Sequence, residues 1–171
     1  IETWEPGSLG GKALAEVLFG EINPSGKLPL TIPRSVGQLQ MVYNHKPSQY
    51  FHKYAFEKIK PLYPFGYGLS YSTFKISEPE LSEINWDGKG TLDVAVNVEN
   101  IGEVEGKETI QLYVRDMYSS VTRPVIELKG YKKVNVRPME KKSIVFSLLF
   151  IVENNTYHTK SQDWRCRKTG Y

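Results

Sequence analysis

The sequence has few residues that can form disulfides or bind metals. It contains one cysteine and three histidines among 171 residues. Cys166 cannot form an internal disulfide, and it has no metal-ligand spacing with His45, His52 or His158. We therefore expect no metal or other cofactor, and a structural or surface role for each histidine.

Long apolar runs and an excess of one charge are absent as well. No stretch approaches the roughly 20 apolar residues that cross a bilayer, so the sequence predicts no membrane span. The net charge is only +3, and residues 150–171 supply +2 of it. The rest of the chain is close to neutral, which argues against a nucleic-acid partner despite the pI of 8.8. The chain begins with Ile1 rather than Met, and we expect a preceding part.

Residues 8–19 have the period of an amphipathic helix. Its apolar face is formed by Leu9, Ala13, Leu14, Val17 and Leu18, while Lys12 and Glu16 point outward. Ser8 is a candidate N-cap, and Gly20 is a candidate left-handed residue after the last turn. Gly10 and Gly11 in the first turn indicate a close backbone approach, either to a sheet or to an anion.

A turn and a strand are expected after this helix. Residues 23–26 have the composition of a turn. Residues 27–33 alternate apolar and other side chains, as a strand does. Because Pro29 and Pro33 cannot donate to a ladder, this segment would be an edge strand or a strand end.

Residues 43–74 are rich in aromatic side chains but have neither a helical nor a strand period. They hold ten of the 21 aromatic residues of the chain, Tyr43, Tyr50, Phe51, Tyr54, Phe56, Tyr63, Phe65, Tyr67, Tyr71 and Phe74. An irregular segment leaves backbone groups without partners, so these aromatics indicate a strap packed against another surface. Stacking on sugars is a second interpretation. Stacking on bases is a third, which the scarcity of cations disfavours.

From residue 75 onward the pattern is that of short strands with one apolar face. The alternating apolar residues are Leu92, Val94, Val96 and Val98, then Ile110, Leu112 and Val114, then Val134 and Val136, then Ile144, Phe146 and Leu148. Gly130 is a candidate bulge or bend. Turn residues between these runs predict an antiparallel β-sandwich whose boundary lies near residues 74–80. Residues 150–171 continue no such period.

Several motifs occur in the order found in one enzyme family. They are Trp-Glu-Pro-Gly at 4–7, the helix with its glycine at 11–20, Asn-Pro-Ser-Gly-Lys-Leu-Pro at 23–29, Pro-Phe-Gly-Tyr-Gly-Leu-Ser-Tyr at 64–71 within the motif at 64–74, and the segments 97–102, 111–116 and 123–131. With these motifs, residues 1–149 resemble the C-terminal portion of glycoside hydrolase family 3, the family of β-glucosidases and β-xylosidases. The last three segments resemble its fibronectin type III-like domain.

The resemblance implies a mainly β fold, an antiparallel fibronectin type III-like (immunoglobulin-like) β-sandwich preceded by a remnant helix and strand of an α/β sandwich domain. We expect residues 1–40 to be that remnant, 41–74 the aromatic-rich connecting strap and 75–149 the fibronectin type III-like domain. Residues 150–171 would be a divergent tail, for which disorder and a shifted reading frame are the two interpretations. The implied partners are the missing N-terminal barrel and α/β sandwich of the parent chain.

The resemblance also bears on the chemistry. Retaining glycoside hydrolysis needs two carboxyl groups facing one bond. In the family the nucleophile is an Asp on the barrel and the acid/base is a Glu on a segment that would precede Trp4, and no residue here matches either. We therefore assign no catalytic, cofactor-binding or metal-binding residue, and no substrate-binding residue is identified. The remaining candidates are read as structural, with Trp4 as an anchor of the helix start rather than a sugar contact, Ser70 as a turn cap, and Glu2, Glu5 and Glu16 as surface charges.

Two functions follow from these observations. The first is the C-terminal fragment of an exo-acting β-glycosidase, inactive alone, with a structural bracing role and a periplasmic or secreted location. At 8–9 the sequence has Ser-Leu where the family commonly has Gln-Glu, so the polar contacts of that pair are not carried over. The second is a non-enzymatic β-sandwich module that binds an oligo- or polysaccharide or a protein through the 43–74 aromatics, Tyr113 or Tyr118.

Overall fold

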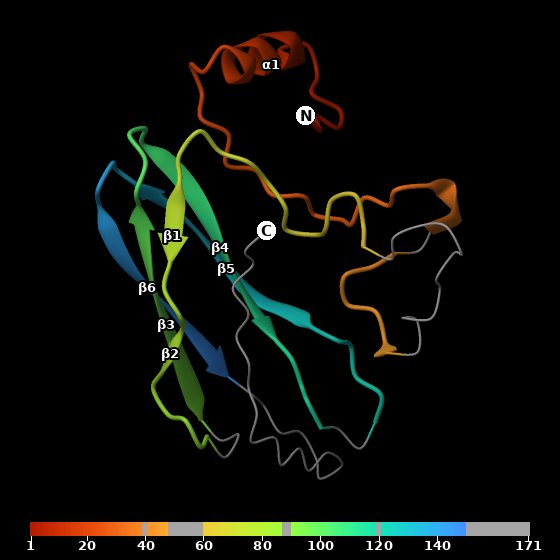
Figure 1. Cartoon of the computed structure of the whole chain (residues 1–171), viewed down its shortest axis with the longest axis vertical. Coiled ribbons are helices and arrows are strands. Elements are labelled where there is room, and N and C mark those ends of the chain that lie inside the picture. The colour runs from red at the N-terminus through yellow and green to blue at the C-terminus, as the bar shows by residue number, and fades with distance from the viewer. Residues whose placement is uncertain (39–40, 48–59, 87–89, 119–120, 150–171) are drawn as a thin grey trace.

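The fold is described from a computed structural model of the chain, which covers residues 1–38, 41–47, 60–86, 90–118 and 121–149. Its elements are α1 (Gly10–Leu18), the 3-10 helix η1 (Val36–Gln38), and the strands β1 (Phe74–Ile76), β2 (Glu80–Leu81), β3 (Thr91–Asn100), β4 (Gly106–Val114), β5 (Glu127–Val136) and β6 (Lys141–Leu149). In Figure 1, α1 lies beyond one end of the strands, and the segment that contains η1 extends away to one side.

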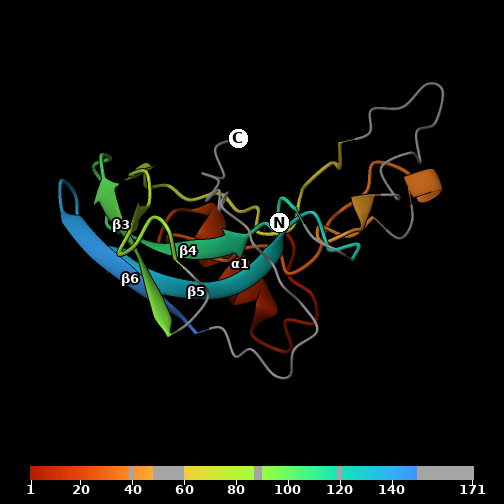
Figure 2. The ribbon, with the colours of Figure 1, turned by 90° about the horizontal axis from the view of Figure 1, so that it is seen from below.

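The strands form two antiparallel sheets. β3 is the centre of the first sheet: β6 pairs with it over most of its length, and the short strands β1 and β2 pair with it as well. β4 and β5 form the second sheet. The view from below shows the long, curved strands of both sheets side by side (Figure 2). The chain is therefore mainly β, as the alternating pattern predicts.

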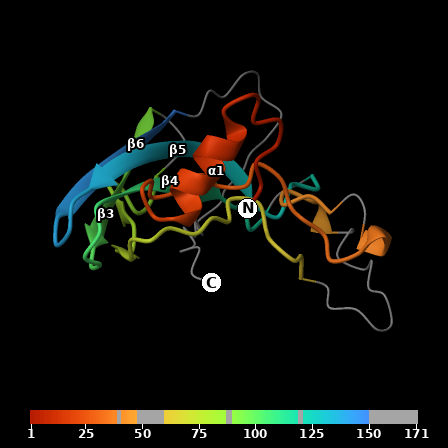
Figure 3. The same cartoon turned by 90° about the horizontal axis from the view of Figure 1, so that it is seen from above.

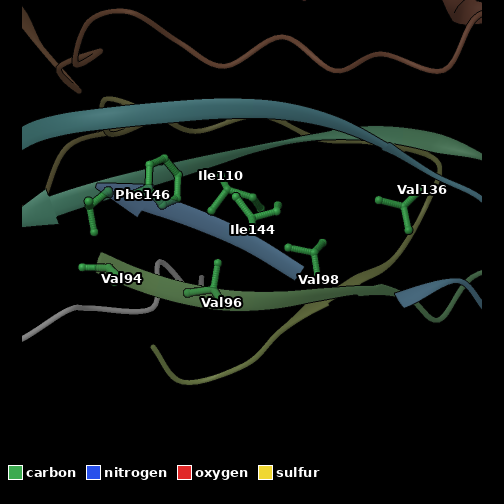
Figure 4. Packing of buried hydrophobic residues seen from close by; sticks show 8 residues of the cluster. Val94, Val96, Val98, Ile110, Val136, Ile144 and Phe146 are labelled. Carbon is green, nitrogen blue, oxygen red and sulfur yellow. The ribbon is translucent and has the colours of Figure 1, made fainter. Parts of the chain in front are cut away.

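The core lies between the two sheets. Alternate residues of β3 are buried, and the cluster combines Val94, Val96, Val98, Ile110, Leu112, Val136, Ile144 and Phe146 (Figure 4). These are the inward-facing residues expected from the sequence, and Val98 and Val136 have no exposed surface. Burial of such side chains is the main source of stability for a two-layer fold.

One irregularity changes which side chains of β4 face inward. The register between β4 and β5 shifts at Leu112 and Tyr113, next to the position where Leu112 pairs with Gly130. The bulge expected near Gly130 is therefore present. As a result Tyr113 is buried and Val114 is only half-buried, whereas strict alternation predicts Val114 on the apolar face.

Two lysine side chains link β5 and β6, whose backbones do not pair with each other. Lys142 Nζ donates to the carbonyl of Asn135 at 2.6 Å, and Lys132 Nζ donates to the carbonyl of Val145. The Lys132 ammonium also lies 5.4 Å from the ring centroid of Phe146. Charged side chains at a sheet edge oppose pairing with another chain.

The turns of the sandwich are fixed by polar side chains. Asn100 is fully buried, yet its amide donates to the carbonyls of Val104 and Val136 and its oxygen accepts from the Gly102 N–H. In the connection from β5 to β6, the Arg137 N–H donates to the Glu140 carboxylate, and this bond lowers the pKa of Glu140.

The N-terminal part differs from expectation in three details. α1 begins at Gly10 after Leu9, and no side chain caps it, so Ser8 is not the N-cap. Gly20 does adopt the left-handed conformation, with φ of 82°. Residues 23–26 form no turn. Residues 27–33 form no strand but only one isolated antiparallel bridge, between Ile32 and Tyr63, because Pro29 and Pro33 interrupt any ladder.

Some predicted features lie outside the described residues. These are Tyr50, Phe51, His52, Tyr54 and Phe56 of the aromatic segment and the whole of 150–171, with His158 and Cys166. Within the described ranges, no helix is long and apolar enough to cross a membrane. The same ranges contain no group of three or more His, Cys, Asp or Glu residues that could hold a metal ion.

We predict that Phe146→Ala lowers the free energy of unfolding by about 3–5 kcal/mol, because it leaves a cavity between the sheets. The matched control is Val145→Ala on the same strand, whose side chain is 42% exposed and whose loss should cost less than about 0.5 kcal/mol. Urea unfolding followed by circular dichroism measures both. Equal costs for the two variants would contradict the assignment of the inward face.

Candidate functional site at the seam between the arm and the sandwich

Within the described residues, hydrogen bonds, an ion pair and ring contacts join three segments outside the main strand pairings. We call residues 21–33 the arm and the described residues 41–47 and 60–74 the strap, and the seam is where both meet β4. The arm and strap pair through their backbones: the Leu28 N–H donates to the Tyr67 carbonyl and the Gly66 N–H donates to the Leu28 carbonyl, each at 2.8 Å. Backbone hydrogen bonds therefore hold the arm against the strap.

Asn23 is the hub of the seam. Its side-chain oxygen accepts from the Ser70 hydroxyl at 2.9 Å and from the Tyr71 N–H at 3.0 Å. Its amide donates to Ser72 Oγ at 2.7 Å and to the Glu105 carbonyl at 2.9 Å. One side chain thus ties the arm, the strap and the start of β4 together. Because all four hydrogen bonds involve an uncharged amide, their combined contribution to stability depends little on salt concentration or pH.

Ser72 continues this network into the sandwich. It is buried, and its hydroxyl donates to the Val104 carbonyl at 2.6 Å. Gly106 lies directly beneath, where an added Cβ would be 2.3 Å from Ser72 Oγ and 2.7 Å from Asn23 Nδ2. Only glycine at this position allows both polar side chains to approach β4.

A partly buried ion pair forms the second link. Lys27 Nζ of the arm lies 2.8 Å from Glu108 Oε1 of β4, and the two side chains are 16% and 12% exposed. Lys27 Nζ also lies 3.4 Å from the carbonyl of Gly68. Its ammonium therefore contacts the strap and the sandwich together. Removal of one partner would leave a charge with little access to water, which is costly.

The arm and the strap approach each other closely beside this ion pair. An added Cβ on Gly68 would lie 2.2 Å from the carbonyl oxygen of Gly26 and 2.9 Å from Lys27 Cδ. No atom lies within 4 Å of an added Cβ on Gly26 itself. The tight approach thus constrains Gly68 and leaves Gly26 free to vary.

Aromatic rings fill the other part of the seam. Phe65 stacks on Tyr43 with ring centroids 4.1 Å apart, and Tyr113 meets both rings edge-on. The Tyr113 hydroxyl donates to Gln111 Oε1 at 2.9 Å. Tyr113 is only 7% exposed, so it cannot stack on a sugar, whereas Tyr118 is 71% exposed. For Tyr43, Phe65 and Tyr113 the structure shows the packing interpretation.

The other residues singled out from the sequence are described here by their exposure and local contacts. Ser70 Oγ accepts from the Ser72 N–H at 3.1 Å, which confirms its expected role in a turn. Trp4 has a φ of 50° and is 57% exposed, so it does not anchor the helix start as expected. His45 Nδ1 lies 3.0 Å from the Lys46 carbonyl. Glu16 pairs with Lys12 on the surface of α1.

Sequence reasoning did not identify the seam as a unit. It singled out the motifs at 23–29 and 64–74 separately and connected neither of them with Glu108. The structure buries Glu108 against Lys27. The available signal was the run of small and polar residues in both motifs, but the sequence does not say which two segments meet.

Two family models match the chain. The glycosyl hydrolase family 3 C-terminal domain matches residues 1–71, and the fibronectin type III-like domain matches residues 108–171. The periplasmic β-glucosidase of Salmonella typhimurium is 45% identical over 158 residues, which cover 86% of this chain and 21% of the relative. The chain belongs to glycosyl hydrolase family 3.

Other family 3 relatives give the same correspondence. A β-xylosidase of Formosa agariphila is 44% identical over 88% of this chain and 21% of its own length. A solved β-glucosidase from Erythrobacter marinus superposes with a TM-score of 0.81 at 38% identity, over 92% of this chain and 23% of that one. The β-glucosidase of Listeria innocua in complex with glucose gives a TM-score of 0.78 at 38% identity, over 86% and 22% of the two chains.

The family 3 chain therefore spans about a fifth of the length of the relatives it matches, in their C-terminal part. The fibronectin type III-like match includes residues 150–171, which lie outside the described residues. The shifted reading frame in that segment stays a prediction, and the nucleotide sequence is the observation that decides it.

We predict that Gly68→Ala opens the seam, because its new methyl group meets the Gly26 backbone and such overpacking costs about 1–3 kcal/mol. The amides of Leu28 and Gly66 should then exchange faster with deuterium, since both bond across the seam. Gly26→Ala is the matched control and should leave exchange unchanged. Equal protection in both variants would contradict the steric argument.

A second prediction concerns the ion pair. Glu108→Gln should lower the free energy of unfolding by about 1–3 kcal/mol, since it leaves the Lys27 ammonium partly buried without a countercharge. The double variant Lys27→Met, Glu108→Leu should recover most of that loss.

The matched control for the ion pair is Glu127→Gln, which breaks the more exposed pair of Glu127 with Lys129 on β5 and should cost less than about 0.5 kcal/mol. Urea titration of the parent chain and the three variants gives the free energy of unfolding of each. If Glu108→Gln lowers the free energy of unfolding no more than Glu127→Gln does, the Lys27–Glu108 pair does not stabilise the chain as expected.

Proposed function

We propose that this chain is the C-terminal part of an exo-acting β-glycosidase, in which the sandwich braces the preceding domains, and that the chain alone is inactive. The seam is the observation that carries the proposal. Asn23 and Lys27 bind the arm to β4, so the sandwich holds the segment that leads back to α1 in a fixed position. A sandwich joined by a loose linker would need no such network.

The inactivity follows from the chemistry that hydrolysis requires. A retaining mechanism uses two carboxyl groups roughly 5 Å apart on either side of the scissile bond. Several acidic side chains of the described residues serve other roles: Glu108 neutralises Lys27, Glu140 accepts from a backbone N–H, and Asp93 accepts from Ser147. The nucleophile and the acid/base are proposed to lie in the preceding domains of the parent chain.

The relatives support the class of substrate and the location. Because they are named β-glucosidases and β-xylosidases, we propose that the parent enzyme hydrolyses β-glucosides or β-xylosides. One relative is named a periplasmic enzyme, which supports a periplasmic or secreted location. The alternative of a glycan-binding module has less support, since the ring of Tyr113 is buried against Phe65 rather than presented to solvent.

We predict that the purified chain gives no hydrolysis of aryl β-glucoside or aryl β-xyloside above the buffer blank, because both catalytic carboxyl groups are proposed to lie in the preceding domains. A solved relative, the Listeria innocua β-glucosidase, serves as the positive control in the same assay. Pull-down on insoluble glucan and xylan tests the alternative module, and we expect no retention. Hydrolysis that co-elutes with the chain in gel filtration would refute the proposal.

A further inference from the structure

The connection between β5 and β6 holds a methionine in a backbone conformation that favours glycine. Pro138 and Met139 are the central residues of a turn, which the Glu140 N–H closes by donating to the Arg137 carbonyl at 3.0 Å. Met139 has a φ of 59°, where glycine or asparagine is the usual residue. Its side chain is 77% exposed, so packing within the chain offsets little of the strain. Strain that the surrounding structure holds in place is typical of functional sites.

Asn100 fixes this turn beside the connection from β3 to β4. The Met139 N–H donates to the Asn100 carbonyl at 2.9 Å, and the Asn100 N–H donates to the Glu140 carbonyl at 3.0 Å. The Asn100 side chain is fully buried and donates to the Val104 carbonyl at 2.8 Å. One residue therefore holds both connections in place.

Three apolar side chains are exposed on these two connections. We call Ile101, Val104 and Met139 the tip patch; their exposed fractions are 50%, 47% and 77%. The hydrogen bonds of Asn100 place the three residues at neighbouring backbone positions. In Figure 3 both connections lie at the left end of the sandwich, and α1 lies to their right. Grouped apolar side chains on a rigid surface are typical of an interaction site.

The two connections carry opposite charges. Residues 101–105 have a net charge of −2, from Glu103 and Glu105. Residues 137–142 have a net charge of 3 − 1 = +2, from Arg137, Lys141 and Lys142 against Glu140. A surface with both signs side by side around an apolar centre is complementary to a second copy of itself, turned by a two-fold axis. In that arrangement the acidic connection of each copy faces the basic connection of the other.

We propose that the tip patch is a contact between two copies of this chain, related by a two-fold axis close to Met139. This contact is separate from the proposed bracing role. The Met139 side chain of each copy packs on the apolar side chains of the other, and methionine adapts well to such surfaces. Two short connections make a small contact beside the roughly 1,200–2,000 Å² that stable pairs bury, so we expect a weak dimer in exchange with the monomer.

Sedimentation velocity of the full chain over a concentration series measures the association. We expect the sedimentation coefficient of the parent chain to rise with concentration toward that of a dimer. The first test variant is Met139→Gly, because glycine fits the left-handed turn while the side chain is lost. Its urea midpoint should be unchanged or higher, and its dimer should dissociate at least about tenfold more readily.

The matched control removes an exposed apolar side chain elsewhere. Ile84 is 82% exposed and lies in the connection that leads to the start of β3, whereas Asn100 ends that strand. Ile84→Ser should therefore retain the association of the parent chain.

Charge reversal tests the two-fold arrangement. Arg137→Glu and Glu103→Lys, each alone, place like charges in both halves of the contact, so each should weaken association by about tenfold or more. An equal mixture of the two variants brings opposite charges together in both halves. The mixture should therefore form a heterodimer about as tightly as the parent chain associates with itself.

Three results would overturn the dimer proposal. The first is a Kd above about 1 mM for the parent chain, since association is then negligible. The second is equal association of the parent chain and Met139→Gly, which would place the contact elsewhere. The third is a mixture of the two charge variants that stays monomeric although both are folded. None of these results bears on hydrolysis, so the proposed function is tested independently.

Discussion

The close backbone approach of the arm to the strap is the constraint on which the rest of the seam depends. The carbonyl of Gly26 occupies the place where any side chain on residue 68 would begin. At that separation Lys27 reaches both the Gly68 carbonyl and Glu108, and Leu28 can exchange backbone hydrogen bonds with residues 66 and 67. Small displacements would break several of these bonds together, which makes the seam a cooperative unit.

This cooperativity explains how an irregular strap can be ordered. Segments without regular structure leave backbone groups unpaired, and burying them is expensive. Here the strap satisfies its groups with the arm and with polar side chains, chiefly Asn23 and Ser72, rather than with a ladder. The aromatic rings of Tyr43 and Phe65 then exclude water from the part next to β4. Polar satisfaction and ring packing therefore act on the same segment.

The sandwich was predictable and the seam was not, for a physical reason. Period-two alternation reports directly on a strand with one buried face, so Val94, Val96, Ile144 and Phe146 could be placed in the core from the sequence. Contacts between segments far apart in sequence leave no such period. The pairing of Lys27 with Glu108 joins residues 81 positions apart, and neither side chain has a local pattern that names the other.

The errors at the N-terminal part have the same origin. Residues 27–33 alternate as a strand should, but two prolines interrupt the ladder, so that Leu28 and Ile32 exchange backbone hydrogen bonds with the strap without forming a strand. Trp4 was expected to anchor the helix start, but its ring is mostly exposed within this chain. Local pattern predicts what a segment can form, and tertiary contacts decide what it does form.

The two ends of the described structure differ in how their surfaces are satisfied. At the side where β5 and β6 meet, the ammonium groups of Lys132 and Lys142 donate hydrogen bonds to backbone carbonyls of the sandwich itself. At α1, apolar side chains remain at the surface although the helix end is firmly held by Tyr71. The bracing role proposed above requires a rigid seam, and among the described residues Asn23, Ser72 and the Lys27–Glu108 pair supply the contacts that make it rigid.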